Sequence, residues 1–245
     1  MKRFTVLFIV CFTLFPLFHA CNVHYGKSLK GNRQIVHEEM AIDDYESISL
    51  NLPAEVIYRH IPQEKPFLQV SVDENLLPLL DISVHNGRLT LNQKENIGLQ
   101  ASHFVIYTNS RHLSRVSIGG SGNVVLEKEV NAQNMEIVIS GSGNLKTDSL
   151  YCELLDVQIS GAGDADLNGA ATRAQYAISG AGDIHAFDYL VEDLDCRISG
   201  AGDIRAYVDK KLYARISGTG NIRYKGSPET VDKQVSGLGS ISQTK

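Results

Sequence analysis

Tryptophan is absent from this 245-residue sequence, aromatic residues make up only 7% of it, and it has 6 prolines. Basic residues number 23 against 28 acidic ones, which gives a formal net charge of −5. No basic tract is long enough to neutralise a nucleic-acid backbone, because that requires clustered lysine and arginine. We therefore exclude nucleic acid as a partner.

Glycine is abundant, with 21 residues, and 43% of the chain is hydrophobic. That hydrophobic content is enough for the core of one large domain or two small ones. Glycine in such number, without a collagen period, indicates many tight turns.

The N-terminus has the features of an export signal. Met1-Lys2-Arg3 is positively charged, and residues 4–18 are almost wholly apolar. An apolar run of about fifteen residues is too short to cross a bilayer comfortably but is typical of a secretory leader. Phe18-His19-Ala20-Cys21 resembles a lipobox, in which the cysteine is lipidated and becomes the new N-terminus.

The resulting interpretation is a signal peptide at residues 1–20, lipidation of Cys21, and a polar tether at residues 21–37. The alternative is an ordinary signal peptide cut after Ala20. We expect an outer-membrane lipoprotein of the cell envelope that is attached to the membrane by its lipid anchor. The periplasmic and the surface face both stay open. No acidic cluster follows Cys21, which favours the periplasmic face.

One motif recurs seven times in the C-terminal half. It consists of an aliphatic residue, Ser or Gly, Gly, any residue, Gly, and then Asp, Asn or Ser, and successive copies start 18 to 21 residues apart. The copies start at Ile118, Ile139, Ile159, Ile178, Ile198, Ile216 and Val235. Seven copies at a nearly constant period indicate a repeat architecture.

Apolar residues alternate with polar ones on both sides of each glycine motif, which predicts two short strands joined by a tight corner. The glycines would supply positive φ or close backbone approach. A unit of about twenty residues cannot bury its apolar face alone, so the units must stack at about 4.8 Å with like residues in interior columns. We therefore predict an all-β fold with a parallel β-helix-like solenoid over residues 116–243.

Residues 38–115 lack the glycine motif but also read as strands. Asn86-Gly87 lies between two alternating segments and predicts a two-residue hairpin turn. We expect this N-terminal β segment to cap or extend the solenoid, because an uncovered first coil would expose strand edges. One continuous domain over residues 38–243 would result.

These features together resemble a known family, the auto-transporter adhesins with a head GIN domain, which are common among lipoproteins of Bacteroidota. The resemblance covers about residues 38–243. It lies in residues 73–77 (DENLL), the hairpin of residues 86–89 (NGRL), and the seven corners that follow. It implies a right-handed β-helix related in shape to pectin lyases, without recognised catalytic residues, and a role in adhesion.

Three corner aspartates are a candidate metal site. Asp164, Asp183 and Asp203 would lie one coil apart, and their charges would repel unless they were solvated, protonated or bridged by a cation. Calcium is the natural cation for such oxygen ligands. The alternative is turn chemistry, in which Asp and Asn only accept a hydrogen bond from the local backbone. Apart from calcium, we expect no cofactor.

Four arginines are candidate ligand-binding residues: Arg197, Arg205, Arg215 and Arg223. They flank the last corners and could form one basic patch on an acidic protein. Stacked arginines can bind the carboxylate or sulfate of an anionic glycan through paired hydrogen bonds. The alternative is a solvated face on which nearby aspartates, such as Asp193 and Asp195, are the partners.

An enzyme is not expected. The repeats are nearly uniform, with no insertion to wall a cleft, and His185 is the only histidine among them, so no base accompanies the corner serines. We predict a non-catalytic envelope lipoprotein that presents a β-helical surface as an adhesin for a glycan or another envelope protein. The alternatives are a polysaccharide-active lyase or hydrolase of pectin-lyase-like shape and a purely structural envelope protein. Cys152 and Cys196 fall at different positions in the repeat, so no disulfide between them is predicted.

Overall fold

The computed structural model describes residues 28–61, 64–94 and 97–244. The fold is all-β, with 65% of residues in strands arranged as a solenoid of about 6 turns, so the predicted fold class is confirmed. The only helical element among the described residues is the short 3-10 helix Leu77–Leu79. None of the helical structure described could cross a membrane. The predicted leader and Cys21 lie outside the described residues.

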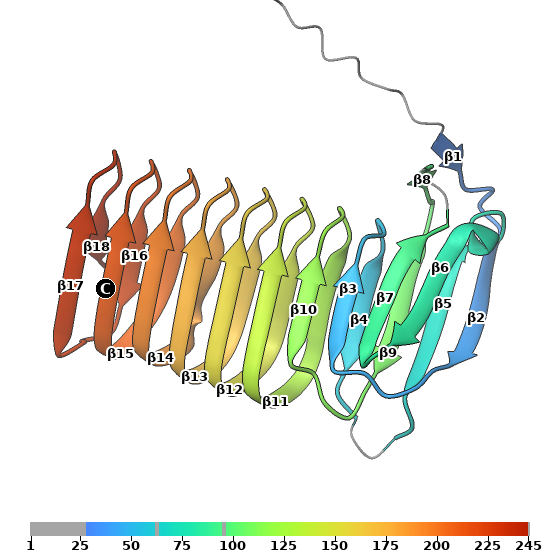
Figure 1. Cartoon of the computed structure of the whole chain (residues 1–245), viewed down its shortest axis with the longest axis horizontal. Coiled ribbons are helices and arrows are strands. Elements are labelled where there is room, and N and C mark those ends of the chain that lie inside the picture. Colours follow the sequence, from blue (N-terminus) through green and yellow to red (C-terminus); the bar gives the residue numbers. More distant parts are fainter. Residues whose placement is uncertain (1–27, 62–63, 95–96, 245) are drawn as a thin grey trace, which may run out of the picture.

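Five long strands build the solenoid, and each turns around at its middle, at the lower edge of Figure 1. They are β11 (Asn123–Ile139), β12 (Leu145–Ile159), β13 (Ala165–Ile178), β14 (Ile184–Ile198) and β15 (Ile204–Ile216). Each strand pairs in parallel with the next, so the coils stack in register. The first half of each strand lies in one layer, called here the rear layer, and the second half lies in the other, the front layer.

Shorter strands extend both layers. The front layer also holds β6 (Leu80–His85), β7 (Arg88–Gln93), β3 (Ser47–Leu50), β10 (Arg115–Ile118) and β17 (Thr230–Val235). The rear layer also holds β2 (Ile35–Ala41), β5 (Phe67–Asp73), β9 (Phe104–Asn109), β4 (Glu55–Arg59), β16 (Ile222–Lys225) and β18 (Ile241–Gln243). A separate parallel pair consists of β1 (Ser28–Lys30) and β8 (Gly98–Gln100).

The core is made of columns of aliphatic side chains between the two layers. Alternate residues of each strand point inward, and equivalent positions of successive coils pair with one another. One column, with every member at most 1% exposed, consists of Ile139, Ile159, Ile178, Ile198 and Ile216. No coil could bury these side chains by itself, so the stacking of like residues is what stabilises the solenoid.

The seven glycine corners lie in a single column along the upper edge in Figure 1. The second glycine of each corner approaches the previous corner so closely that a Cβ on Gly163 would lie 1.8 Å from the carbonyl oxygen of Gly143. Positive φ occurs at Gly87, Gly169 and Gly226 but at none of the corner glycines. Of the two expected reasons for glycine, close backbone approach is therefore the one that applies.

The acidic and amide side chains that end the corners form a hydrogen-bonded ladder between coils. The backbone N–H of Asp183 donates to Asp164 Oδ1 at 2.8 Å, and that of Asp203 donates to Asp183 Oδ1 at 2.7 Å. The ladder begins at Asn123 and continues through Asn221 to Ser240. These side chains therefore accept backbone hydrogen bonds, as the turn interpretation expected, but the donor is the backbone N–H of the next coil and not that of the same turn.

The N-terminal segment supplies one more coil and a cap. β3 and β4 pair with β10 and β11, respectively, so they form one more coil, which stacks against the first coil that has a glycine corner. The chain then leaves to build the cap before it returns at β10. Within the cap β6–β7, β5–β9 and β2–β5 are antiparallel pairs. Asn86 and Gly87, with φ of 50° and 71°, form the predicted hairpin turn.

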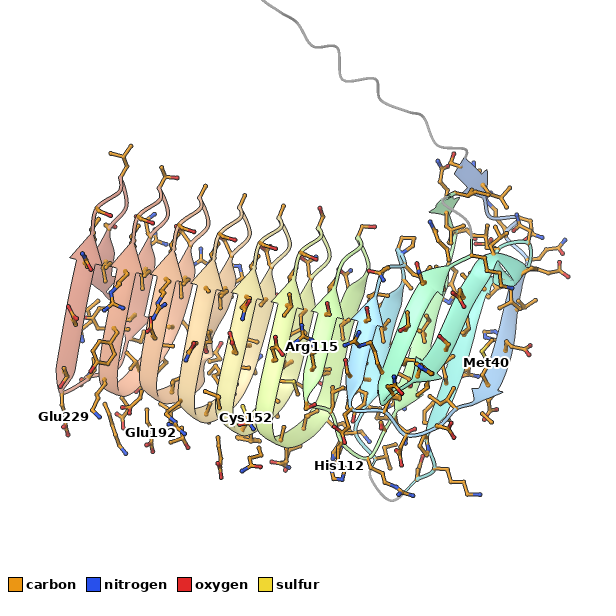
Figure 2. The ribbon with its side chains drawn as sticks, viewed as in Figure 1. Met40, His112, Arg115, Cys152, Glu192 and Glu229 are labelled. Carbon is orange, nitrogen blue, oxygen red and sulfur yellow. The ribbon has the colours of Figure 1, made fainter. Side chains whose placement is uncertain are left out.

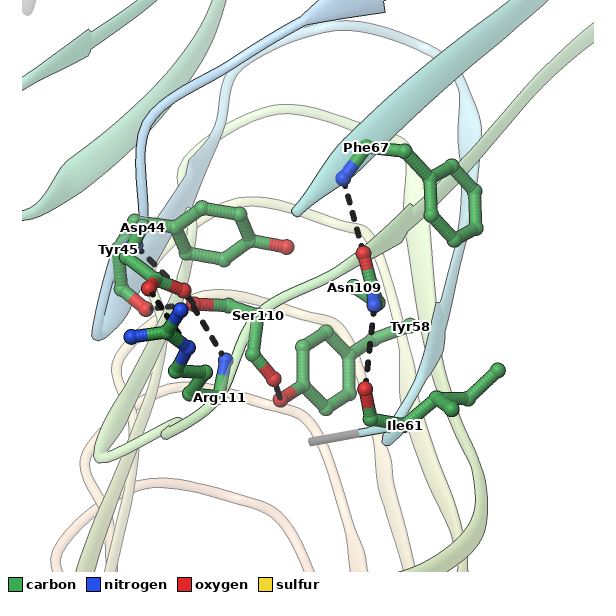
Figure 3. A network of polar contacts seen from close by, with 8 residues as sticks. All are labelled: Asp44, Tyr45, Tyr58, Ile61, Phe67, Asn109, Ser110 and Arg111. Carbon is green, nitrogen blue, oxygen red and sulfur yellow. Dashed lines mark hydrogen bonds and ion pairs between the residues drawn. The ribbon is translucent and has the colours of Figure 1, made fainter. Parts of the chain in front are cut away.

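A buried polar network joins the cap to the first coils (Figure 3). Ser110 lies at its centre, where its hydroxyl accepts from the backbone N–H of Tyr45 at 3.0 Å and its carbonyl accepts from the hydroxyl of Tyr58 at 2.9 Å. The hydroxyls of Tyr45 and Thr108 lie 2.8 Å apart. Burial raises the pKa of both tyrosines above their ordinary value, so they stay protonated and can donate.

The C-terminal coil ends the solenoid without a covering element among the described residues. β17 pairs with β15 alone, and Val231 and Val235 are 40% and 45% exposed. Lys233 pairs with the buried Ala214, so it occupies an inward position, with its ammonium 4.7 Å from the centre of the Tyr224 ring. An inward-pointing charge on an edge strand opposes the addition of a further strand.

The two cysteines of the solenoid are free thiols. Cys196 is fully buried, and Cys152 is half-buried with its Sγ 3.3 Å from the hydroxyl of Tyr189. Burial raises the pKa of both thiols. They fill the core as small, unreactive groups.

Candidate binding face

The outer face of the front layer carries a groove of about 520 Å³ beside the glycine corners. Two rows of residues from successive coils line it, one from six coils and one from five. The outward residue that precedes each corner is Val138, Gln158, Ala177, Arg197, Arg215 or Gln234. The second row is the serine of each corner, namely Ser160, Ser179, Ser199, Ser217 and Ser236.

The groove follows from the strand alternation and from one small residue. Residues next to the buried Ile178 and Ile198 must point outward, because successive side chains on a strand alternate between the faces. At the coil between Gln158 and Arg197 this outward residue is Ala177. Its short side chain leaves the depression between its two longer neighbours.

Two cations from neighbouring coils lie in this groove. Arg197 donates from Nε to Asp195 Oδ1 at 3.1 Å and from Nη2 to Asp195 Oδ2 at 2.8 Å, and these contacts raise the pKa of Arg197 further above its ordinary value. Arg215 pairs with Arg197 across the strands and, among the described residues, has no salt bridge or side-chain hydrogen bond. No carboxylate lines the groove.

Three other hollows lie on the same face beside the groove described above, which is called here the main groove. The smallest, of about 80 Å³, shares Arg197 with the main groove. A second, of about 270 Å³, shares Asp195 with this smallest hollow and also contains Arg173 and Tyr213. A hollow of about 620 Å³ lies nearer the cap, around Arg115, which Figure 2 labels in the middle of the molecule. These hollows contain carboxylates, which distinguishes them from the main groove.

The four arginines predicted to bind a ligand do not form one patch. Arg205 and Arg223 pair with each other on the outer face of the rear layer, where Arg205 Nη1 lies 3.4 Å from His185 Nδ1. The corner that begins after Ile198 carries the chain from the front layer to the rear layer, so it separates Arg197 from Arg205. Sequence spacing alone does not predict that the arginines lie on two different layers, because it does not show how sharply the corner turns the chain.

The three corner aspartates do lie one above another, as expected. One oxygen of each accepts a hydrogen bond from the next coil. Within residues 28–61, 64–94 and 97–244, no group of three or more His, Cys, Asp or Glu side chains is arranged to hold a metal. Calcium at Asp164, Asp183 and Asp203 stays a prediction.

The sequence places Ala177 in the outward row before the corners but predicts no depression there, and it does not single out Ser110. The depression at Ala177 depends on the longer side chains of Gln158 and Arg197 in the coils before and after it, and only the stacking of coils places these residues side by side. The partners of Ser110 in the junction network lie 52 to 66 residues away in the chain, so no local pattern marks them.

The family described as "putative auto-transporter adhesin, head GIN domain" matches residues 44–228. A crystal structure described as a putative adhesin from Bacteroides fragilis is 26% identical, with a TM-score of 0.85. A structure described as a putative lipid binding protein from Parabacteroides distasonis is 29% identical, with a TM-score of 0.74. A putative adhesin from Parabacteroides merdae is 27% identical, with a TM-score of 0.71.

The alignments cover 89% of this chain for the first two structures and 90% for the third, and 100% of each of those chains. No curated protein matches the chain. The family match spans most of the chain and agrees with the stacked corners and the capped solenoid. The chain therefore belongs to the family of putative auto-transporter adhesins with a head GIN domain.

Proposed function

We propose that this protein is a non-catalytic binding protein of the cell envelope, an adhesin that contacts its ligand with the outer face of the front layer. The observation that carries the proposal is the groove of about 520 Å³ that spans six coils and combines apolar lining residues with two arginines, two glutamines and five serines. A concave surface with a few convergent polar groups is the usual form of a binding site. The adhesin descriptions of the family and of two structural neighbours support the same role.

Export and anchoring complete the proposal. The leader at residues 1–20 would deliver the chain to the envelope, and lipid on Cys21 would hold it at the outer membrane. Replacing Cys21 with Ser should move the exported protein from the membrane fraction to the soluble fraction. Equal membrane association of both forms would contradict lipid anchoring.

The binding role is tested by filling the groove. We expect the mature chain to bind on a glycan array and Ala177→Trp to lose that binding, because the indole would occupy the depression. Val125→Trp is the matched control, since Val125 is a half-buried outward residue of the rear layer. Retained binding by Ala177→Trp, or turnover of a polysaccharide by the wild-type chain, would contradict the proposal.

A further inference from the structure

We infer that the main groove of the front layer takes an extended polyanionic glycan, a chain bearing carboxylates or sulfates, which lies along the solenoid axis across several coils. This inference rests on the proposed binding function and adds the ligand class and the residues that select it.

The charge of the groove differs from that of the protein. The whole chain carries a formal charge of −5, whereas the groove has two arginines and no acidic residue in its lining. Asp195 offsets part of the charge of Arg197 from just outside the groove. Arg215 keeps its full charge, so an anionic group gains most by approaching Arg215.

The two guanidinium groups suit carboxylate or sulfate recognition. Asp195 occupies two of the five N–H donors of Arg197 and holds its planar head in a fixed direction, which leaves the other donors for a ligand. Arg215 has all of its donors free among the described contacts. Because the two side chains come from neighbouring coils, they can bind anionic groups about 5 Å apart or share one group.

The length of the groove favours a chain over a single small anion. Its outward residues come from six successive coils, which at about 4.8 Å per coil extend over about 24 Å. The row of exposed corner serines follows the same direction, and Gln158 and Gln234 lie toward its two ends. Hydroxyl and amide groups at regular spacing can pair with the hydroxyls of successive sugar units, whereas one phosphate headgroup would use only a fraction of them.

The experiment measures binding of the mature chain to polygalacturonate, to uncharged dextran, and to vesicles that contain phosphatidylglycerol. We expect polygalacturonate to bind, dextran to bind at least tenfold more weakly, and the vesicles not to bind. Raising NaCl from 50 to 500 mM should weaken the polygalacturonate complex, because salt screens the attraction.

The arginine variants identify the face. Arg215→Ala should weaken polygalacturonate binding at least tenfold, Arg215→Lys should have an intermediate effect because it keeps the charge without the paired donors, and Arg197→Ala with Arg215→Ala should abolish binding. Arg205→Ala with Arg223→Ala is the matched control, since it removes an equivalent pair from the rear layer, and should leave binding unchanged. Circular dichroism and thermal melting would show that each variant folds.

The outcomes separate this inference from the proposed function. Equal binding of dextran and polygalacturonate, with no effect of Arg215→Ala, would overturn the polyanionic ligand and leave the binding role in place. Capture by anionic vesicles without polygalacturonate binding would overturn the glycan. A loss of binding confined to Arg205→Ala with Arg223→Ala would place the site on the rear layer and overturn both proposals.

Discussion

Ser102 donates two hydrogen bonds to the fully buried carboxylate of Asp73, one from its backbone N–H and one from its hydroxyl, each 2.7 Å long. The backbone N–H of Arg33 donates a third at 2.6 Å, so Asp73 ties the start of the described chain and the β8–β9 connection to the end of β5. Gly31 packs against the same carboxylate, where a Cβ would lie 2.2 Å from Asp73 Oδ2.

These contacts predict acid sensitivity of the cap. Burial opposes ionisation of Asp73, but the hydrogen bonds from Ser102 and Arg33 outweigh it and hold the pKa below its ordinary value. The unfolded chain therefore binds the proton more tightly. The stabilising contribution is complete above the unfolded pKa of about 3.9 and is lost as the pH falls through the folded pKa.

The prediction is tested with Asp73→Asn. The variant should unfold at lower denaturant concentration than the wild type at pH 7, and the difference should shrink as the pH is lowered toward 3. Chemical denaturation at several pH values measures this. Glu74→Gln is the control, because Glu74 is exposed and should show no such difference. A gap between wild type and Asp73→Asn that is constant with pH would refute the role of ionised Asp73.

Gly163→Ala should destabilise the solenoid by about 1–3 kcal/mol or more, because a new methyl group would be forced against the Gly143 carbonyl. Gly98→Ala is the matched control, since a Cβ there meets only ordinary contact, 3.4 Å from the nearest atom. Differential scanning calorimetry of both variants measures the effect. Equal melting temperatures would show that the corners can separate without cost.

The hydrogen-bonded ladder of corner side chains predicts different losses of stability for two replacements of Asp183. Asp183→Ala removes the acceptor for the backbone N–H of Asp203 and should cost about 0.5–1.5 kcal/mol. Asp183→Asn keeps an acceptor oxygen, as Asn144 and Asn221 do in their own coils, and should be nearly neutral. Urea unfolding separates the two, and a loss with Asn equal to that with Ala would mean that the charge itself matters.

Lys233→Val should promote end-to-end association. The substitution replaces the inward charge of β17 with an apolar residue beside the exposed Val231 and Val235, which leaves an edge open to strand addition. Sedimentation velocity over a range of concentrations would detect the larger species. Asp232→Val, on the outward side of the same strand, should sediment like the wild type. An identical response of both variants would assign the effect to hydrophobicity alone.

Much of the fold can be predicted from local sequence patterns in this chain. The period of the corners and the alternation around Ile159 or Ile198 are sufficient for an all-β stacked solenoid, because only stacking buries those side chains. The Asn86-Gly87 turn is likewise a local property, since two consecutive residues with positive φ favour that dipeptide.

The placement of the arginines depended on the tertiary structure. Arg197 and Arg205 are eight positions apart, and whether they share a face depends on the direction in which the intervening corner turns the chain. The same holds for the groove at Ala177, whose walls come from neighbouring coils, and for Asp73, whose partners are distant in sequence. The sequence by itself therefore determined the repeating unit, through side-chain periodicity and glycine spacing, whereas three-dimensional packing decided which repeated side chains meet and so where a ligand can bind.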